Sequence, residues 1–282
     1  MINPANLKEK EYLARQIIGN LQSAVVAFSG GVDSTLLLKL TAETLGERAL
    51  AVTIYSPIHN SNLPSEAQKL AKKLLAKHVL AEGKELEDSF FCQNPPNRCY
   101  ICKTHVCQEL RKIAKEHNLK AMVDGTNADD LNDFRPGLQA AIEAQMISPL
   151  KEAGFTKAEV RQLAKILNLP NWNKPSSPCL CTRIPYGEAI TIEKLQQIEK
   201  AENFLHHLLG FPELRVRHHG QVARLEVSDD NLKFIIDQEM RLSITSFLKK
   251  LGFKHVGLDL EGYRRGSMNE PLITPDGFNS SQ

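Results

Sequence analysis

The chain has 282 residues, 42% of them hydrophobic and 24% charged, which is the composition of a globular protein with one large domain or two smaller ones. Its 35 basic and 33 acidic residues leave a net charge of +2, which argues against a broad nucleic-acid-binding surface. The N-terminal residues contain no apolar run of signal-peptide type, and no stretch approaches the roughly 20 apolar residues of a membrane span. We therefore expect a cytoplasmic protein with no membrane or nucleic-acid partner, whose six cysteines are reduced and form no disulfide.

A glycine-rich turn follows the first predicted strand. Residues 24–28 form an apolar run of strand length, residues 35–40 begin a helical pattern, and Ser29-Gly30-Gly31-Val32-Asp33-Ser34 joins the two. The bare N–H groups of such a turn, with the partial positive charge of a helix N-terminus, suit a phosphate group. The turn has neither the Walker motif nor the dinucleotide-binding motif. The alternative to a phosphate-binding turn is an ordinary turn of small residues. The candidate nucleotide-binding residues here are Ser29, Gly30, Gly31, Asp33 and Ser34.

Strands and helices alternate through residues 1–170, which we take as an ATP-binding domain once the turn is given that role. Helical spacing covers residues 7–20, the stretch from Thr35 to Leu45 with a stop at Gly46, and residues 65–77, 104–117 and 156–167, the last beginning with a capping box at Thr156 and Glu159. Apolar runs at residues 49–54, 78–80 and 121–124 predict three further strands. This alternation predicts an α/β fold with a doubly wound parallel sheet, in which ligands bind beyond the carboxyl ends of the strands.

A second polar segment follows the strand at residues 121–124. Its candidate nucleotide-binding residues are Asp124, Gly125, Thr126 and Asn127, although a plain polar turn is the alternative. Asp129, Asp130 and Asp133 follow, and they could help to hold Mg²⁺ or form a solvated turn with helix-capping residues. Arg135 could meet a phosphate group.

The last hundred residues have a different pattern. Residues 171–187 are rich in proline with little periodicity, so we expect a hinge and catalytic loop there, followed by a C-terminal domain at residues 188–282. A helix at 191–209, a β-hairpin at 214–227, a helix at 231–251 and a strand at 255–260 predict a smaller α+β domain. One hairpin face carries Arg215, Arg217, Arg224 and Glu226, for which a solvated face is the plain interpretation.

Four of the cysteines form two close pairs. Cys99 and Cys102 make a C-x-x-C motif, expected on a proline-rich loop before a helix, and Cys179 and Cys181 lie on the hinge loop. All four could close a tetrahedral zinc site. Three could instead hold three irons of a [4Fe–4S] cluster and leave the fourth iron open to an exogenous ligand. The remaining two, Cys92 and Cys107, are predicted to be core or incidental residues.

These motifs together carry a family resemblance. Ser29–Ser34 resembles the PP-loop of the ATP pyrophosphatase superfamily, whose members bind the β- and γ-phosphates of ATP there, release pyrophosphate and transfer AMP to a substrate oxygen. With Arg98–Lys103, Asp124–Asn127, the segment Cys179–Gly187 and the hairpin, nearly the whole chain resembles the LarE family. That family comprises ATP-dependent sulfur transferases that build the nickel-pincer nucleotide cofactor of lactate racemase.

The resemblance implies a substrate and a chemistry. The family adenylates the carboxylates of pyridinium-3,5-biscarboxylic acid mononucleotide and converts them to thiocarboxylates, with ATP and Mg²⁺. Ser29 and Ser34 would then bond phosphate oxygens, and Asp33 would help to position magnesium through ATP. A thiolate near the ATP site would supply the nucleophile that attacks the activated carboxyl group.

The resemblance also implies roles for the cysteines and the basic residues. In the family, sulfur comes either from one cysteine, matched here by Cys179, or from a [4Fe–4S] cluster on three cysteines, matched by Cys99, Cys102 and Cys179. Cys181 departs from this pattern and could be a spare ligand, a fourth ligand or a bystander. Family members form trimer-based rings, so a homo-oligomer, taken as a hexamer, is expected. The residues expected to bind the nucleotide substrate are Arg183, Arg215, Arg217 and Glu226.

Two other functions compete with this one. A PP-loop thiolase acting on tRNA shares the chemistry but needs a nucleic-acid surface, which a net charge of +2 does not suggest. A zinc-stabilised nucleotide-binding protein without sulfur chemistry would use all four paired cysteines as metal ligands.

Overall fold

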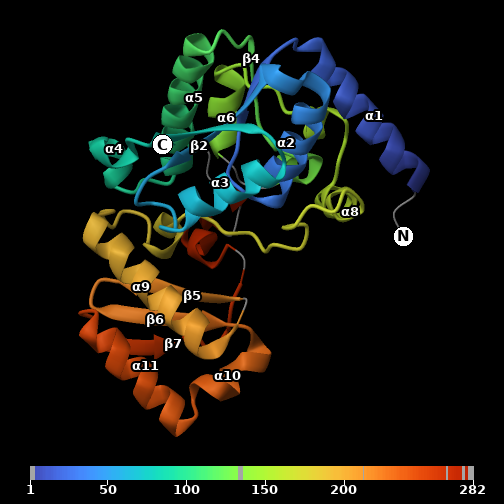
Figure 1. Cartoon of the computed structure of the whole chain (residues 1–282). Helices are drawn as coiled ribbons and strands as arrows, with labels where there is room; N and C mark the ends of the chain where they lie inside the picture. The colour runs from blue at the N-terminus through green and yellow to red at the C-terminus, as the bar shows by residue number, and fades with distance from the viewer. Residues whose placement is uncertain (1–3, 133–135, 212, 265, 275–276, 279–282) are drawn as a thin grey trace. The chain divides into compact units, whose positions relative to one another are not determined.

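The chain is divided into two compact units, each with its own core. The structure is a computed structural model that describes residues 4–132, 136–211, 213–264, 266–274 and 277–278. The first unit comprises Met1–Glu85 and Asn97–Ser177, and the second comprises Leu86–Pro96 and Pro178–Gln282 (Figure 1). The sequence-based division assigns residues 86–96 to the first domain, whereas in the structure they group with the second unit. Their backbone explains this, because Asn94 O accepts from Gly187 N at 2.9 Å and Cys92 O from Ile190 N at 2.8 Å.

The first unit is built on a four-stranded parallel sheet. Its strands are β1 (Ala24–Ala27), β2 (Ala49–Tyr55), β3 (Lys77–Glu82) and β4 (Ala121–Val123), in the order β3-β2-β1-β4. In the register, Ala24 lies opposite Ala49 on one side and Ala121 on the other. The predicted parallel α/β sheet is therefore confirmed. Because β2 and β3 extend to one side of β1 and β4 lies on the other, the winding direction changes between β1 and β4, which is where such sheets bind ligands.

Helices cover both faces of this sheet, as Figure 1 shows. Val26 and Ala51 point into a core shared with α1 (Pro4–Asn20), α2 (Val32–Leu45), α3 (Leu63–Lys73) and α8 (Lys157–Ile166). Val25 and Leu50, the neighbouring strand residues, point into a second core with α5 (Arg98–Glu116) and α6 (Pro136–Glu143). Strands buried on both faces explain why their sequences are continuous apolar runs.

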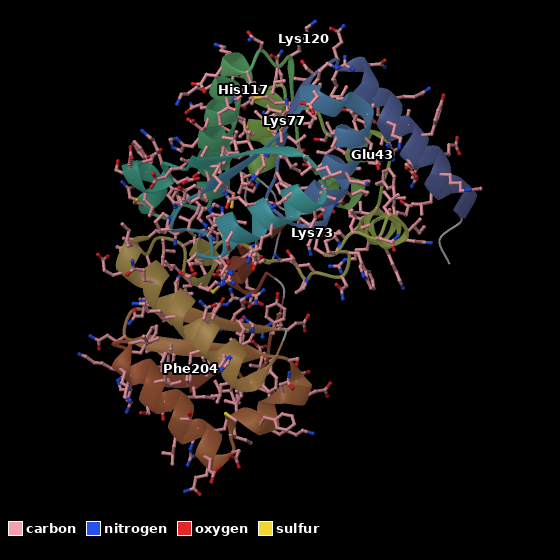
Figure 2. All side chains as sticks on the ribbon, in the orientation of Figure 1. Glu43, Lys73, Lys77, His117, Lys120 and Phe204 are labelled. Carbon is pink, nitrogen blue, oxygen red and sulfur yellow. The ribbon has the colours of Figure 1, made fainter. Side chains whose placement is uncertain are left out.

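The second unit is a small α+β domain, as predicted. Strands β5 (Leu214–His219) and β6 (Val222–Val227) form an antiparallel hairpin, and β7 (His255–Leu258) pairs in parallel with β6. Helices α9 (Ile192–Leu209), α10 (Asp229–Ile235) and α11 (Gln238–Lys250) share its core. Phe204 of α9, labelled in Figure 2, stacks on Phe247 of α11 with ring centroids 3.7 Å apart.

The remaining short elements of the chain, from both units, are α4 (Ser89–Cys92), α7 (Pro149–Glu152), β8 (Ile273–Thr274), β9 (Gly277–Phe278) and 3-10 helices at Gly46–Arg48, Glu85–Glu87, Ala128–Asn132, Leu180–Arg183 and Ser267–Leu272.

Helix boundaries confirm two predictions and correct two others. The capping box at Thr156 and Glu159 has both of its hydrogen bonds, and Gly46 ends α2 with a positive φ of 57°. Helix α5 begins at Arg98, so the C-x-x-C motif lies in its first turn rather than on the preceding loop. Two prolines, Pro95 and Pro96, cannot continue a helix but can directly precede one. The sequence-based prediction, which starts this helix at residue 104, does not use that signal.

The second correction concerns the helix expected at residues 231–251. It is two helices, α10 and α11, because the Asp237 carboxylate accepts hydrogen bonds from Glu239 N and Met240 N and starts a new helix there. None of the helices within the described ranges is long and apolar enough to cross a membrane.

Candidate functional site

The Ser29–Ser34 turn connects the end of β1 to the first turn of α2. Phe28 is fixed at the strand end, where Val52 O accepts from its N–H at 2.9 Å and its own carbonyl accepts from Thr53 Oγ1 at 2.6 Å. Gly30 has a positive φ of 70°, which turns the chain, and Gly31 caps α2 in an extended conformation without any side-chain hydrogen bond. The first turn of α2 therefore keeps its amide donors for an anion.

Three hydroxyl groups surround this turn. Ser29 Oγ and Ser34 Oγ lie 3.2 Å apart, and Ser34 Oγ donates to Gly31 O at 3.1 Å. Thr35 Oγ1 donates to the same carbonyl at 2.8 Å. The two serines thus face one side of the turn with groups that can donate to phosphate oxygens.

Asp124 directly follows β4 and is a buried carboxylate that accepts three hydrogen bonds. It accepts from Lys103 Nζ at 2.9 Å, Ser148 Oγ at 2.8 Å and Thr126 N at 3.2 Å. Burial would raise the pKa of the Asp124 carboxyl, but the Lys103 ammonium and the surrounding hydrogen bonds outweigh burial and hold that pKa below its usual value. Lys103 lies one residue after Cys102, so this ion pair connects the cysteine-bearing helix α5 to the end of β4.

The structure brings the two predicted nucleotide-binding segments into contact. A Cβ atom placed on Gly125 would lie 2.8 Å from Ser34 N and 2.9 Å from Asp33 C, so only glycine fits against the start of α2. Asn127 Nδ2 donates to Asp33 Oδ1 at 3.2 Å. Both segments follow parallel strands, β4 and β1, that are neighbours in the sheet, which is why they meet.

Lys157 contacts the candidate site and is absent from the residues predicted from the sequence. It is the first residue of α8, and its ammonium group donates to Asp33 Oδ2. The Thr156 capping box was the available signal, because it marks a helix start near a polar turn. The Lys157 ammonium group and the Asp33 carboxylate therefore form an ion pair at the Ser29–Ser34 turn.

The acidic residues after Asn127 have structural partners. Asp129 Oδ2 accepts from Lys157 N at 2.8 Å, and Asp130 Oδ2 accepts from Asn127 N at 3.0 Å. These two contacts are of the turn and helix-capping kind. Asp133 and Arg135, also considered from the sequence, lie outside the described residues.

The cysteines differ sharply in exposure. Cys99 is exposed and Cys102 half-buried in the first turn of α5, with Cys102 Sγ 4.0 Å from Glu85 Oε1. In the other unit, Cys179 is half-buried, whereas Cys181 is completely buried. All six cysteines lie in the described part of the chain and form no disulfide. Among those described residues, no group of three or more His, Cys, Asp or Glu side chains is arranged to hold a metal ion.

The two isolated cysteines have local, apolar or backbone contacts. Cys107 is buried on α5 with its Sγ 3.4 Å from Met146 Sδ, and Cys92 Sγ donates to Leu86 O at 3.4 Å. Burial raises the pKa of both thiols, and Asp88 adds to this effect at Cys92. Neither is poised as a thiolate.

Arg183 fixes the backbone around Cys179. Its guanidinium forms a two-bond ion pair with Glu202, at 3.0 Å for each N···O distance. Its Nη1 donates to Pro178 O at 2.9 Å and to Cys179 O at 3.0 Å. Burial would lower the pKa of this guanidinium, but the Glu202 carboxylate outweighs burial and raises it. Arg183 is buried, so it holds the cysteine loop in place through a charge-assisted network.

On the polar face of the hairpin, Arg215, Arg217 and Glu226 are buried, whereas Arg224 is half-buried. Glu226 is 0% exposed and accepts from Arg217 Nη2 at 2.5 Å and from Ser267 Oγ at 3.0 Å. Arg215 lies over the Tyr263 ring at 5.3 Å, and burial followed by the positive charge of Arg183 lowers the pKa of its guanidinium. The second unit therefore concentrates buried arginines near the Cys179 loop, which suits an anionic ligand.

Comparison with known proteins decides the family. A sequence profile of the NAD synthase family matches residues 9–128. Over 270 residues, 95% of this chain and 96% of the relative, the chain is 37% identical to the pyridinium-3,5-bisthiocarboxylic acid mononucleotide synthase of Lactiplantibacillus plantarum. The chain belongs to the family of this synthase. The predicted resemblance to the LarE family is thereby confirmed, and the PP-loop class to which the family belongs implies ATP and Mg²⁺.

Two further relatives differ in how much of this chain they match. An uncharacterised protein of Synechocystis sp. is 41% identical over 269 residues, covering 94% of this chain and 99% of the relative. A glutamine-hydrolyzing GMP synthase chain of Methanococcus vannielii is 30% identical over 210 residues, covering 69% of this chain and 66% of the relative. The wider PP-loop class thus matches a part of the chain, whereas the synthase family matches nearly all of it.

Proposed function

We propose that this chain adenylates the carboxylates of pyridinium-3,5-biscarboxylic acid mononucleotide with ATP and replaces each adenylate with sulfur. The observation that carries the proposal is full-length membership of the synthase family, combined with a glycine-rich loop whose helix N-terminus has no side-chain cap. A carboxylate oxygen attacks the α-phosphorus, and the bond from that phosphorus to pyrophosphate breaks. A sulfur nucleophile then attacks the acyl carbon and AMP leaves, so one carboxylate becomes a thiocarboxylate in each round.

ATP is assigned to the first unit. Ser29, Ser34 and the amides of Gly30 and Gly31 would bind the pyrophosphate end of the nucleotide, because hydroxyl and amide donors at a helix N-terminus suit a polyanion. Asp33 would help to hold Mg²⁺, and the nearby Lys157 would share the phosphate charge. The second nucleotide-site segment comprises Asp124, Gly125, Thr126 and Asn127.

Cys99, Cys102 and Cys179 are proposed as the ligands of a [4Fe–4S] cluster. Thiolates are the donor type that such clusters take, and three ligands leave one iron open to a sulfide. The exposures fit this set, since Cys99 is exposed and Cys102 and Cys179 are half-buried. Cys181, at 0% exposure, is left out of this set; with it included, the four thiolates would instead make the zinc site of the competing function. When bound, the cluster would supply the sulfide that is transferred; the alternative source is Cys179 itself, which would lose its Sγ and become dehydroalanine.

The second unit is proposed to bind the nucleotide substrate. Arg215 and Arg217 would pair with its phosphate or carboxylates, with Glu226 holding Arg217 in position. Arg183 acts on the cysteine loop through its bonds to Pro178 O and Cys179 O, which supports a positioning role beside any substrate contact. A homo-oligomer, a hexamer by analogy with the family, and a cytoplasmic location complete the proposal.

The test combines metal content with the reaction. After anaerobic purification, the protein should contain iron and acid-labile sulfide, and with ATP and substrate it should release pyrophosphate and AMP while the product gains sulfur by mass spectrometry. Cys179→Ala should abolish sulfur transfer and leave pyrophosphate release intact. A colourless protein carrying zinc, or tight binding of tRNA with no reaction on the pyridinium nucleotide, would contradict the proposal in favour of one of the two competing functions.

A further inference from the structure

The side chain of Asn171, the first residue of the expected hinge, forms hydrogen bonds with the Ser29–Ser34 turn and the residue after it. Its Nδ2 donates to Gly30 O at 3.0 Å and to Thr35 Oγ1 at 2.9 Å, across 141 and 136 residues of sequence. Thr35 Oγ1 in turn donates to Gly31 O at 2.8 Å. Asn171 therefore braces both the turn and the first turn of α2.

The orientation of the Asn171 amide follows from its partners. Gly30 O can only accept, so the amide must present its NH₂ group to the loop. The opposite amide oxygen, Oδ1, is buried and has no hydrogen-bond partner among the described residues. The reversed amide would place two acceptor oxygens against each other, so the loop accepts only one arrangement.

This contact determines which way a loop N–H points. Gly30 O and Gly31 N belong to the same peptide unit, which is trans, so its carbonyl and its N–H point in opposite directions. With the carbonyl turned toward Asn171, the N–H of Gly31 points toward Ser29 Oγ, 3.4 Å away, on the side of the two serine hydroxyls. Because the residues on both sides of this peptide bond are glycines, no Cβ atom opposes rotation of the peptide.

We propose that Asn171 is a positioning residue that fixes the Gly30–Gly31 peptide so that Gly31 N–H faces the pyrophosphate end of ATP. The inference rests on the proposed use of ATP at this loop. A flipped peptide would turn the negative end of a carbonyl dipole toward the phosphates and remove one charge-assisted hydrogen bond. Asn171 thus contributes to ATP affinity without touching the nucleotide.

Binding of two nucleotides to the full-length protein tests the proposal. In Asn171→Asp the donor becomes an acceptor, and in Asn171→Ala it is lost; Asn173→Asp is the matched control, since Asn173 is an exposed residue of the same loop. Calorimetry with magnesium and α,β-methylene ATP should give about tenfold to a hundredfold weaker binding in both Asn171 variants, the cost of one hydrogen bond to a charged group. AMP, which lacks the pyrophosphate end, should bind as it does to the unaltered protein.

The outcomes separate this inference from the proposed function. If the unaltered protein binds the ATP analogue but both Asn171 variants bind it equally well, the positioning role is wrong and the use of ATP stands. A parallel loss of AMP and analogue affinity in both variants would also overturn it, because it would indicate a general structural role. If the unaltered protein does not bind the analogue, the use of ATP fails, and this inference fails with it.

Discussion

Gly125 packs against the backbone of Ser34 so closely that a Cβ atom on it would lie 2.8 Å from the Ser34 amide nitrogen. Gly125 belongs to the turn after β4, and Ser34 belongs to the first turn of α2, which follows β1. The close approach and the Asn127–Asp33 hydrogen bond join the segment after β4 to the start of α2. Any shift of one turn is therefore transmitted to the other.

Gly125→Ala should weaken ATP binding. The added methyl group would meet backbone atoms, which cannot rotate away, so the start of α2 must move at a cost of about 1–3 kcal/mol. We expect the dissociation constant for α,β-methylene ATP to rise at least about tenfold. Gly257→Ala in β7 is the control, because its Cβ would meet nothing within 4 Å, and it should bind the analogue normally. Normal binding by Gly125→Ala would show that the two turns do not act together.

Lys157→Met should separate function from stability. The Lys157–Asp33 pair is partly exposed, with side-chain exposures of 37% and 21%, so solvent screening limits its contribution to stability to less than about 1 kcal/mol. At the proposed phosphate site, however, the loss of one cation should weaken analogue binding about tenfold or more. Lys77→Met, which removes an exposed pair with Glu47 on the same sheet, should change neither quantity. Unchanged affinity in Lys157→Met would remove Lys157 from the ATP site.

The fold, and the meeting of the two segments predicted to bind the nucleotide, could be predicted because both depend on local patterns. Continuous apolar strands, alternating helices and glycine turns are visible within short windows, and neighbouring parallel strands bring the segments at Ser29 and Asp124 together. Lys157 and Asn171 were not predictable in the same way. Their contacts with the loop span more than 120 residues and depend on how α8 and the following segment pack.

The hairpin shows a second limit of pattern reading. Alternation identifies a polar face, but it does not say whether solvent or other polar groups cover that face. Here Glu226 is buried between Arg217 and Ser267, and Ser267 comes from a 3-10 helix that has no strong sequence signal. One signal was available. Arg215 and Glu226 face each other across the two strands, and a cross-strand pair of unlike charges stabilises a sheet.

Lys103→Met should make the protein less stable in a pH-dependent way. Asp124 is buried and would lose the ammonium group that holds its pKa low, so we expect a loss of about 2 kcal/mol in the free energy of unfolding at pH 7. A carboxyl whose pKa is lowered on folding stabilises the protein above its unfolded pKa of about 4, and this stabilisation is lost as the pH falls through the lowered value.

The difference between Lys103→Met and the unaltered protein should therefore be full at neutral pH and shrink as the pH falls and the Asp124 carboxyl of the variant becomes protonated. Urea unfolding at a series of pH values measures it. Lys112→Met is the control on the same helix, because its pair with Glu109 is exposed, with 63% exposure at Lys112, and should contribute little at any pH. A difference that is independent of pH would mean that the Asp124 charge is not what Lys103 stabilises.

Cys181→Ala should mainly lower stability, whereas Cys102→Ala should mainly lower the metal content. Cys181 is completely buried, so the loss of its sulfur leaves a small void and should cost about 1 kcal/mol of unfolding free energy without changing the iron content. Cys102 is half-buried, so Cys102→Ala should cost less stability but abolish iron binding, if the three proposed cysteines hold the cluster. Thermal unfolding and anaerobic iron analysis measure the two effects in parallel. Loss of metal from Cys181→Ala would instead make Cys181 a ligand and restore the four-thiolate zinc site as the better explanation of the paired cysteines.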